Sequence, residues 1–279
     1  MNMRRVFTSL AMALLLLPGS FGGQALAQDG GDGPAAGGQV LYIPMASKGF
    51  TTALALATQQ TVNMPFFDRT ESTGVGALTD QQWTESGILW FGVNQQGPMS
   101  RNYADVRFAY SAVGLHMRAT PIDYYLWYPD DPAMNIDLTQ WDSISIQIDT
   151  AFDRSGQPKS SAYQFLTAAA IWINPGKPNQ YRREARGNGS GWDQNWSTSW
   201  SDFYGMTWST NPGPNNNGGE LDYGGDVQMT IPWSAFGLSA PPAPGARWAL
   251  SVSMYDRDGP NSGDVLPRSD WPEFSDPNS

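Results

Sequence analysis

The sequence predicts an all-β protein, specifically a two-sheet antiparallel β-sandwich of jelly-roll type. Three observations support this prediction. Apolar and polar residues alternate with a period of two in several segments, as they do in strands that bury one face. No apolar pattern of helical period persists beyond about ten residues. The 279 residues also include 30 Gly and 21 Pro, which are the residues that make turns between short strands.

The alternation is clearest in the segment 141–150. Ile144, Ile146 and Ile148 lie on one face there, while Ser143, Ser145, Gln147 and Asp149 lie on the other. Further strands of this pattern are expected over 105–110 and 115–119, which would form a hairpin, and over 163–173, 226–233 and 247–256. Two sheets that pack through their apolar faces satisfy the pattern.

The N-terminal residues predict export. Arg4 and Arg5 precede an apolar run over 6–17, and the small residues at 25–27 fit a cleavage site, so residues 1–27 are expected to be a bacterial-type signal peptide. The run is shorter than the roughly 20 residues that span a bilayer, so we expect a secreted or periplasmic protein with no membrane span after cleavage.

Three segments are expected along the chain. After the signal peptide, residues 28–50 are interpreted as a Gly/Pro-rich linker with a short apolar tether, in which 40–50 is open to an edge strand as well. Residues 51–279 are expected to form the sandwich. Between 174 and 225 the alternation fades, and long loops are expected there.

Charge and cysteine content exclude some functions. The formal net charge is −10 with no block of Lys or Arg, so the chain would repel phosphate backbones and no nucleic-acid partner is expected. Only 15% of the residues are charged, which suits a neutral polar partner. The chain has no Cys and therefore no disulfide. A bound ion could stabilise the fold in its place.

Three segments carry a family resemblance. WDSISIQIDT (141–150), DVQMTIPWSAFGL (226–238) and PGARWALSVSMYDRDG (244–259) resemble the family 9 carbohydrate-binding module of the DOMON-like β-sandwich superfamily. The match is best over 100–275. The resemblance implies a non-catalytic sandwich, structural calcium and a sugar held between aromatic rings. Gln147 departs from the acidic residue that the family often has near this position, and only seven residues follow Trp271-Pro272.

The chain has twelve Trp, and sugars are held by flat aromatic rings together with planar polar groups that grip hydroxyls. A polysaccharide or oligosaccharide is therefore the expected partner. The predicted carbohydrate-binding residues are Trp127, Trp172, Arg183, Arg186, Asn188, Trp192, Trp196 and Trp200. For any single Trp among them, filling an edge of the sandwich is the alternative interpretation.

Oxygen ligands clustered in turns predict calcium. The predicted metal ligands are Asp256, Asp258, Asn261 and Asp264 in one turn, and Asp149 and Asp153 in another. Ordinary Asp/Gly turn chemistry is the alternative interpretation.

Catalysis is not expected. His116 is the only His and is expected to be an outward polar residue beside Arg118; no Gly-x-Ser-x-Gly elbow is present, and a zinc site does not suit one His without Cys. Two alternatives stay open. One is a haem-binding DOMON-like electron-transfer domain that uses His116 with Met99, Met134, Met229 or Met254, which we disfavour because Met residues more often fill core gaps. The other is a glycoside hydrolase-associated module that acts in polysaccharide breakdown.

Overall fold

The chain divides into two units, Met1–Gly37 and Gly38–Ser279. The computed structural model describes residues of the second unit, namely 40–44, 61–68, 78–91, 103–123, 125–129, 136–153, 156–168, 181–205 and 225–272. The predicted signal peptide, the linker over 28–39 and Trp172 therefore lie outside the described residues.

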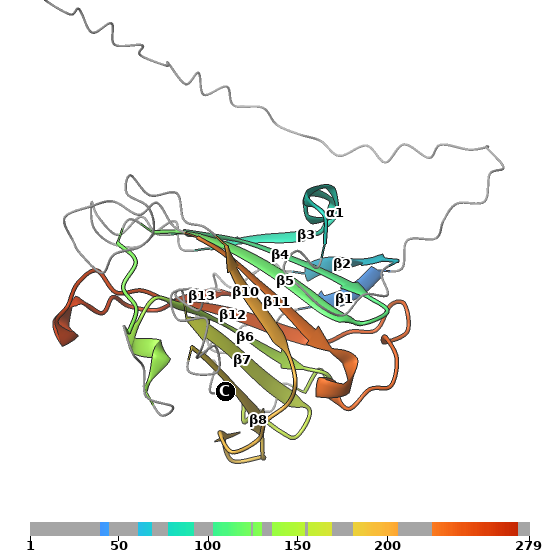
Figure 1. Cartoon of the computed structure of the whole chain (residues 1–279). Coiled ribbons are helices and arrows are strands. Elements are labelled where there is room, and N and C mark those ends of the chain that lie inside the picture. The colour runs from blue at the N-terminus through green and yellow to red at the C-terminus, as the bar shows by residue number, and fades with distance from the viewer. Residues whose placement is uncertain are drawn as a thin grey trace, which may run out of the picture. The chain divides into compact units, whose positions relative to one another are not determined.

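The first sheet contains seven strands in the order β1-β2-β4-β5-β11-β10, with β3 also paired to β4 (Figure 1). The strands are β1 (Val40–Pro44), β2 (Thr61–Phe67), β3 (Gly87–Phe91), β4 (Tyr103–Ser111), β5 (Gly114–Ile122), β10 (Ser201–Gly205) and β11 (Asp226–Pro232). The pairing is antiparallel except between β2 and β4, where Phe66 and Phe67 run parallel to Tyr110 and Ser111.

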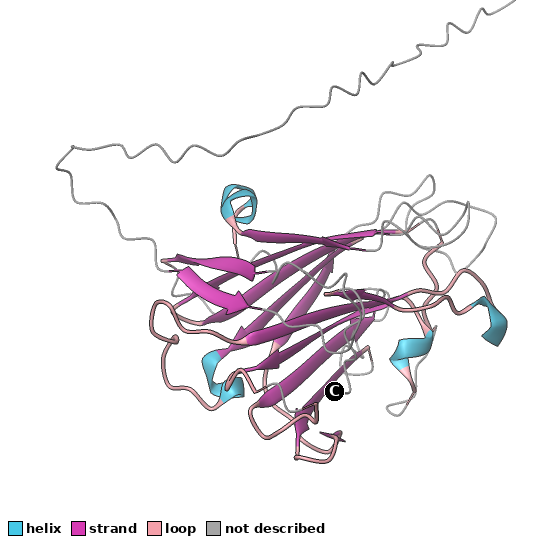
Figure 2. Ribbon diagram, turned by 180° about the vertical axis from the view of Figure 1, so that it is seen from behind, coloured by secondary structure: helices cyan, strands magenta, loops and turns pink. Residues whose placement is uncertain are grey.

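The second sheet contains six strands in the order β13-β12-β6-β7-β8-β9, all antiparallel. They are β6 (Ser143–Asp149), β7 (Ala162–Ala168), β8 (Arg182–Gly187), β9 (Trp192–Asp193), β12 (Ala249–Tyr255) and β13 (Ser269–Trp271). Strands dominate the described residues (Figure 2), and helix is limited to α1 (Asp80–Glu85) and short 3-10 turns at Leu138–Gln140, Trp233–Phe236 and Ser262–Asp264.

The apolar faces of the two sheets form one core. Phe108, Met117 and Ile231 of the first sheet are buried in the same cluster as Ile146 and Val252 of the second. Strands are present in each segment expected from alternation, although 169–173 of the segment 163–173 lie outside the described residues, and the predicted all-β sandwich is confirmed. Residues 40–50 were open to a tether or an edge strand. In the structure Val40–Pro44 forms the edge strand β1.

The polar face of the second sheet is buried as well. Ser145 and Ser253 are both 0% exposed. Gln147 Nε2 donates to Ser145 Oγ at 2.8 Å, and Ser251 Oγ donates to Gln147 Oε1 at 2.6 Å. These neutral hydrogen bonds give Gln147 a structural role.

Helix α1 covers part of the outer face of the first sheet, away from the second sheet (Figure 1). Thr79 caps the helix through a reciprocal bond with Gln82, which satisfies two backbone N–H groups that a helix start leaves open. Trp83 is buried against Leu78 and Ala109 of β4. Among the described residues, no helix has the length and apolar character needed to cross a bilayer.

Candidate functional site

Two partly exposed Trp rings lie at or just after the hairpin of β8 and β9, and one of them, Trp196, packs on the buried Tyr163 of β7. We define the β8–β9 edge as Tyr163, Arg186, Trp192, Asp193 and Trp196. Arg186 pairs with Asp193 in the strand register, and Trp192 is the next residue toward the turn. The guanidinium of Arg186 lies 5.4 Å from the ring centroid of Tyr163, and the Trp196 ring lies 5.6 Å from the same ring. Part of each Trp surface remains open to solvent.

The turn of this hairpin is built by Asn188. Its side-chain oxygen accepts the backbone N–H groups of Ser190 and Gly191, and Gly189 adopts a φ of 91°, which favours glycine. Gly187 is needed because a Cβ there would overlap the carbonyl oxygen of Lys159. Asn188 was predicted to bind sugar, but in the structure its amide oxygen holds the turn.

Two predicted stacking residues are buried instead. Trp200 is 6% exposed, and its indole N–H donates to Glu184 at 3.0 Å. Trp127 is 8% exposed and belongs to the buried residues before β6. Trp200 belongs to the core cluster, so the alternative interpretation, that the ring fills the sandwich, describes this residue.

Arg183 is turned toward backbone oxygens. Its guanidinium donates to the carbonyls of Arg182 at 2.7 Å and Ile136 at 3.0 Å, and desolvation lowers its pKa. Arg186 and Trp196 are thus the predicted residues that the structure brings together, through the ring of Tyr163. Trp192 pairs with Gly187 and therefore lies on the opposite face of the hairpin from Arg186, with part of its surface open to solvent.

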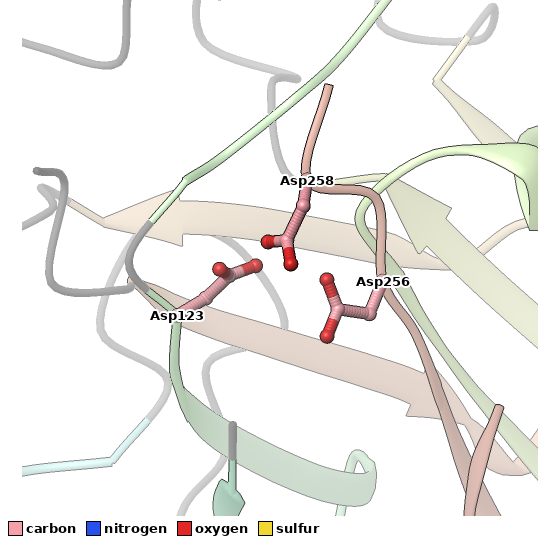
Figure 3. Close-up of side chains that lie close together, drawn as sticks. All are labelled: Asp123, Asp256 and Asp258. Atoms are coloured by element: carbon pink, nitrogen blue, oxygen red, sulfur yellow. The ribbon is translucent and has the colours of Figure 1, made fainter. Parts of the chain in front are cut away.

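Three carboxylates converge where the two sheets meet (Figure 3). The oxygens of Asp123, Asp256 and Asp258 lie within 4.8 Å of one another. Asp123 follows β5 of the first sheet, whereas Asp256 and Asp258 follow β12 of the second. We call these three residues the carboxylate cluster.

A fourth carboxylate lies beside the cluster. Asp142 is buried and accepts backbone N–H groups from Trp127 and from Arg257, the latter at 2.7 Å. Desolvation, and next the charges of Asp123 and Asp256, raise its pKa well above the usual range. A cavity of about 20 Å³ is lined by Asp123, Asp142 and neighbouring residues, which is room for a water-sized occupant.

This arrangement includes only some of the predicted metal ligands. Asp256 and Asp258 are in the cluster, but Asn261 and Asp264 bond to each other at 3.0 Å and cap a 3-10 turn. In the other turn, Asp149 accepts the backbone N–H groups of Ala151 and Asp153, and Asp153 forms an ion pair with Lys159. Both of these turns follow ordinary turn chemistry.

The sequence did not predict Asp123 as a ligand, because its partners in the cluster are distant in the chain. Its one local signal is that it directly follows a strand, as Asp256 does. Carboxylate oxygens that converge in this way are the ligands that calcium prefers.

His116 was expected to be an outward polar residue, and its burial was not predicted. It does lie on the outer face of the first sheet, but it is 0% exposed. Its Nε2 lies 2.8 Å from Ser111 Oγ, and its Nδ1 lies 3.1 Å from Thr230 Oγ1. Met229 of β11 lies in the core, on the opposite face of the sheet from His116. His116 and Met229 therefore do not face each other as two haem ligands would.

Among comparisons with known proteins, only the comparison with solved structures found matches. No family model matches the chain, and no curated protein matches it. The chain is similar to a carbohydrate binding module family 9 (CBM9) from Caldicellulosiruptor kristjanssonii. In its complex with glucose, the identity is 14% and the TM-score 0.44, over 74% of this chain and 82% of that one.

The same module in complex with cellotriose gives 14% identity and a TM-score of 0.47, over 74% of this chain and 80% of that one. A structure from Bacteroides uniformis ATCC 8492 gives 11% identity and a TM-score of 0.47, over 74% and 86% of the two chains. The family suggested by the sequence motifs is that of the first two structures, and the likeness is one of fold. The protein is an all-β sandwich with two built features, the β8–β9 edge and the carboxylate cluster.

Proposed function

We propose that the protein is a non-catalytic, extracytoplasmic carbohydrate-binding sandwich that stacks a saccharide on the β8–β9 edge. One observation carries the proposal: Arg186 and Trp196 lie against the same Tyr163 ring, and the neighbouring Trp192 also keeps part of its surface open to solvent. The C–H face of a sugar ring packs on an indole face, while a guanidinium and a carboxylate grip neighbouring hydroxyls.

We further propose that the carboxylate cluster binds a structural calcium ion. The cluster offers oxygen ligands at the junction of the sheets, in a chain without disulfides. Asp123, Asp256 and Asp258 would hold the ion, and its charge would offset the repulsion among the three carboxylates. The ion would support the fold and would take no part in sugar chemistry.

Titration calorimetry with glucose and cellotriose tests the sugar site. In Trp192→Ala we expect affinity to fall at least about tenfold, which corresponds to about 1.4 kcal/mol. Gln194→Ala is the matched control, since Gln194 is exposed in the same turn and is not part of the edge. Equal affinity of both variants and the wild type would place the sugar elsewhere, and no binding to a wider glycan panel would end the proposal.

A further inference from the structure

A second polar pocket lies far from the β8–β9 edge in the fold, on the outer face of the first sheet. It has a volume of about 430 Å³, within the range of roughly 300–1,000 Å³ that small-molecule sites occupy. Helix α1 supplies one wall through Asp80, Trp83 and Thr84. Strands β4 and β5 supply the floor. We call this the α1 pocket.

The floor of the α1 pocket contains an unusual cross-strand pair. Arg107 of β4 lies directly opposite Arg118 of β5. Like charges in this position destabilise a sheet unless other groups offset them. Carboxylates offset them here: Asp105 receives two bonds from Arg107 at 2.9 Å, and Asp226 receives one from Arg118 at 3.0 Å.

The bonds of Arg107 also fix the pocket wall. Its Nη1 donates to the carbonyl oxygen of Trp83 at 3.0 Å, which ties helix α1 to the floor. Arg118 reaches Asp80 of the helix at 3.7 Å. The guanidinium groups are therefore held in place before any ligand arrives, and holding polar groups in advance lowers the cost of binding.

The charges that line the pocket balance. Arg107 and Arg118 are cations, Asp80 and Asp105 are anions, and Thr84 and Thr120 add two hydroxyls. An anionic ligand would meet two carboxylates, and a cationic ligand would meet two guanidinium groups. A sugar hydroxyl both donates and accepts, so it can bridge a carboxylate and a guanidinium.

From this geometry we propose that the α1 pocket is a second binding site for a neutral saccharide unit. The inference rests on the proposed carbohydrate-binding function but uses a different face of the molecule. A protein with both sites would hold two sugar units or two chains at once, which strengthens attachment to a polymer through multivalency.

The test is calorimetry with glucose, cellotriose and glucuronate on the full chain. In the Trp192→Ala background, residual saccharide binding is expected to remain. Adding Thr84→Trp, which fills the pocket from an exposed helix position, should abolish the residual binding, and Arg118→Gln should weaken it at least about tenfold. Gln81→Trp is the matched control, because Gln81 is exposed on the same helix and does not line the pocket.

The outcomes separate the two proposals. Binding that is lost in Trp192→Ala alone, or residual binding that Thr84→Trp leaves unchanged, overturns the α1 pocket and leaves the proposed function intact. A wild type that binds no saccharide overturns both. Binding that survives Trp192→Ala in full and is lost with Thr84→Trp supports the pocket and removes the β8–β9 edge. Glucuronate that binds where glucose does not overturns the assignment to neutral sugars. Circular dichroism spectra confirm that each variant is folded.

Discussion

The backbone N–H of Arg257 donates to Asp142 at 2.7 Å, while the Arg257 guanidinium turns away from that carboxylate. The guanidinium donates to the carbonyls of Gly259, Pro260 and Gln140, and it rests on the Trp141 ring at 4.3 Å. Asp142 is therefore held by backbone N–H groups, and the charged guanidinium of Arg257 bonds other groups. The Arg257 guanidinium thus bonds backbone carbonyls, while the backbone N–H of the same residue bonds the carboxylate beside the cluster.

Chelation is expected to destabilise the protein. A ligand present at about 100 times its Kd adds about 2.7 kcal/mol to the free energy of unfolding, and each 1 kcal/mol raises Tm by about 2–4 °C for a domain of this size. Calcium should thus raise Tm by several degrees over EDTA. Asp256→Asn should abolish the response, and Asp149→Asn should preserve it, as scanning calorimetry can check. A response lost in Asp149→Asn instead would favour the other predicted turn.

Asp202 is expected to make stability depend on pH. Desolvation raises its pKa, against the opposing effects of Thr167 and Arg182. The folded state then binds the proton more tightly than the unfolded chain, so this contribution is full below the ordinary Asp pKa of about 3.9 and is lost as pH rises through the raised value. Asn does not titrate, so the stability of wild type relative to Asp202→Asn, measured by urea unfolding, should fall as pH rises across this range. Parallel curves would contradict the prediction.

Trp200 is expected to matter for stability more than for sugar contact. Trp200→Ala removes a buried ring and its bond to Glu184, and should lower the free energy of unfolding by about 3–5 kcal/mol. Trp192→Ala should cost about 1 kcal/mol or less, because its ring is half exposed. Denaturant unfolding of both variants measures the contrast, and similar losses would mean that Trp192 is also a packing residue.

Gly187→Ala is expected to weaken both the fold and sugar binding. The added Cβ would meet the backbone of Pro158 and Lys159, so the hairpin that carries Trp192 must shift. We expect a loss of about 1–3 kcal/mol in stability and a parallel loss of affinity for cellotriose. Gly191→Ala is the control, since a Cβ at Gly191 meets open space. Wild-type affinity in Gly187→Ala would show that the position of the hairpin does not matter.

The sequence predicted the strands whose two faces differ in polarity. In β6, for example, Ile146 enters the core and Ser145 lies on the other face. It did not predict β8, because Arg182, Glu184 and Arg186 occupy that strand where an apolar face is expected. Arg182 lies over Trp200 at 5.3 Å and pairs with Asp202 at 3.3 Å, so partners distant in the chain accommodate these charges.

The candidate sites were predicted in part for a similar reason. Arg186, Trp192 and Trp196 are neighbours in the chain, so composition alone pointed to them. The carboxylate cluster brings Asp123 of one sheet close to Asp256 of the other. The spacing of residues along the chain does not predict this contact. For His116, the period of two placed it on the correct face, but the burial of that outer face depends on tertiary structure.

Strand β1 has a practical consequence for anyone who shortens this protein. It pairs along β2 from Val40 opposite Pro65 to Pro44 opposite Thr61. The sandwich was predicted to begin at residue 51. A fragment that begins there would lose β1 and leave the backbone groups of β2 without that partner. Bare strand edges recruit other chains, whereas Pro44 on the natural outer strand discourages such growth. Fragments from residue 38 should stay monodisperse, while those from residue 51 should aggregate.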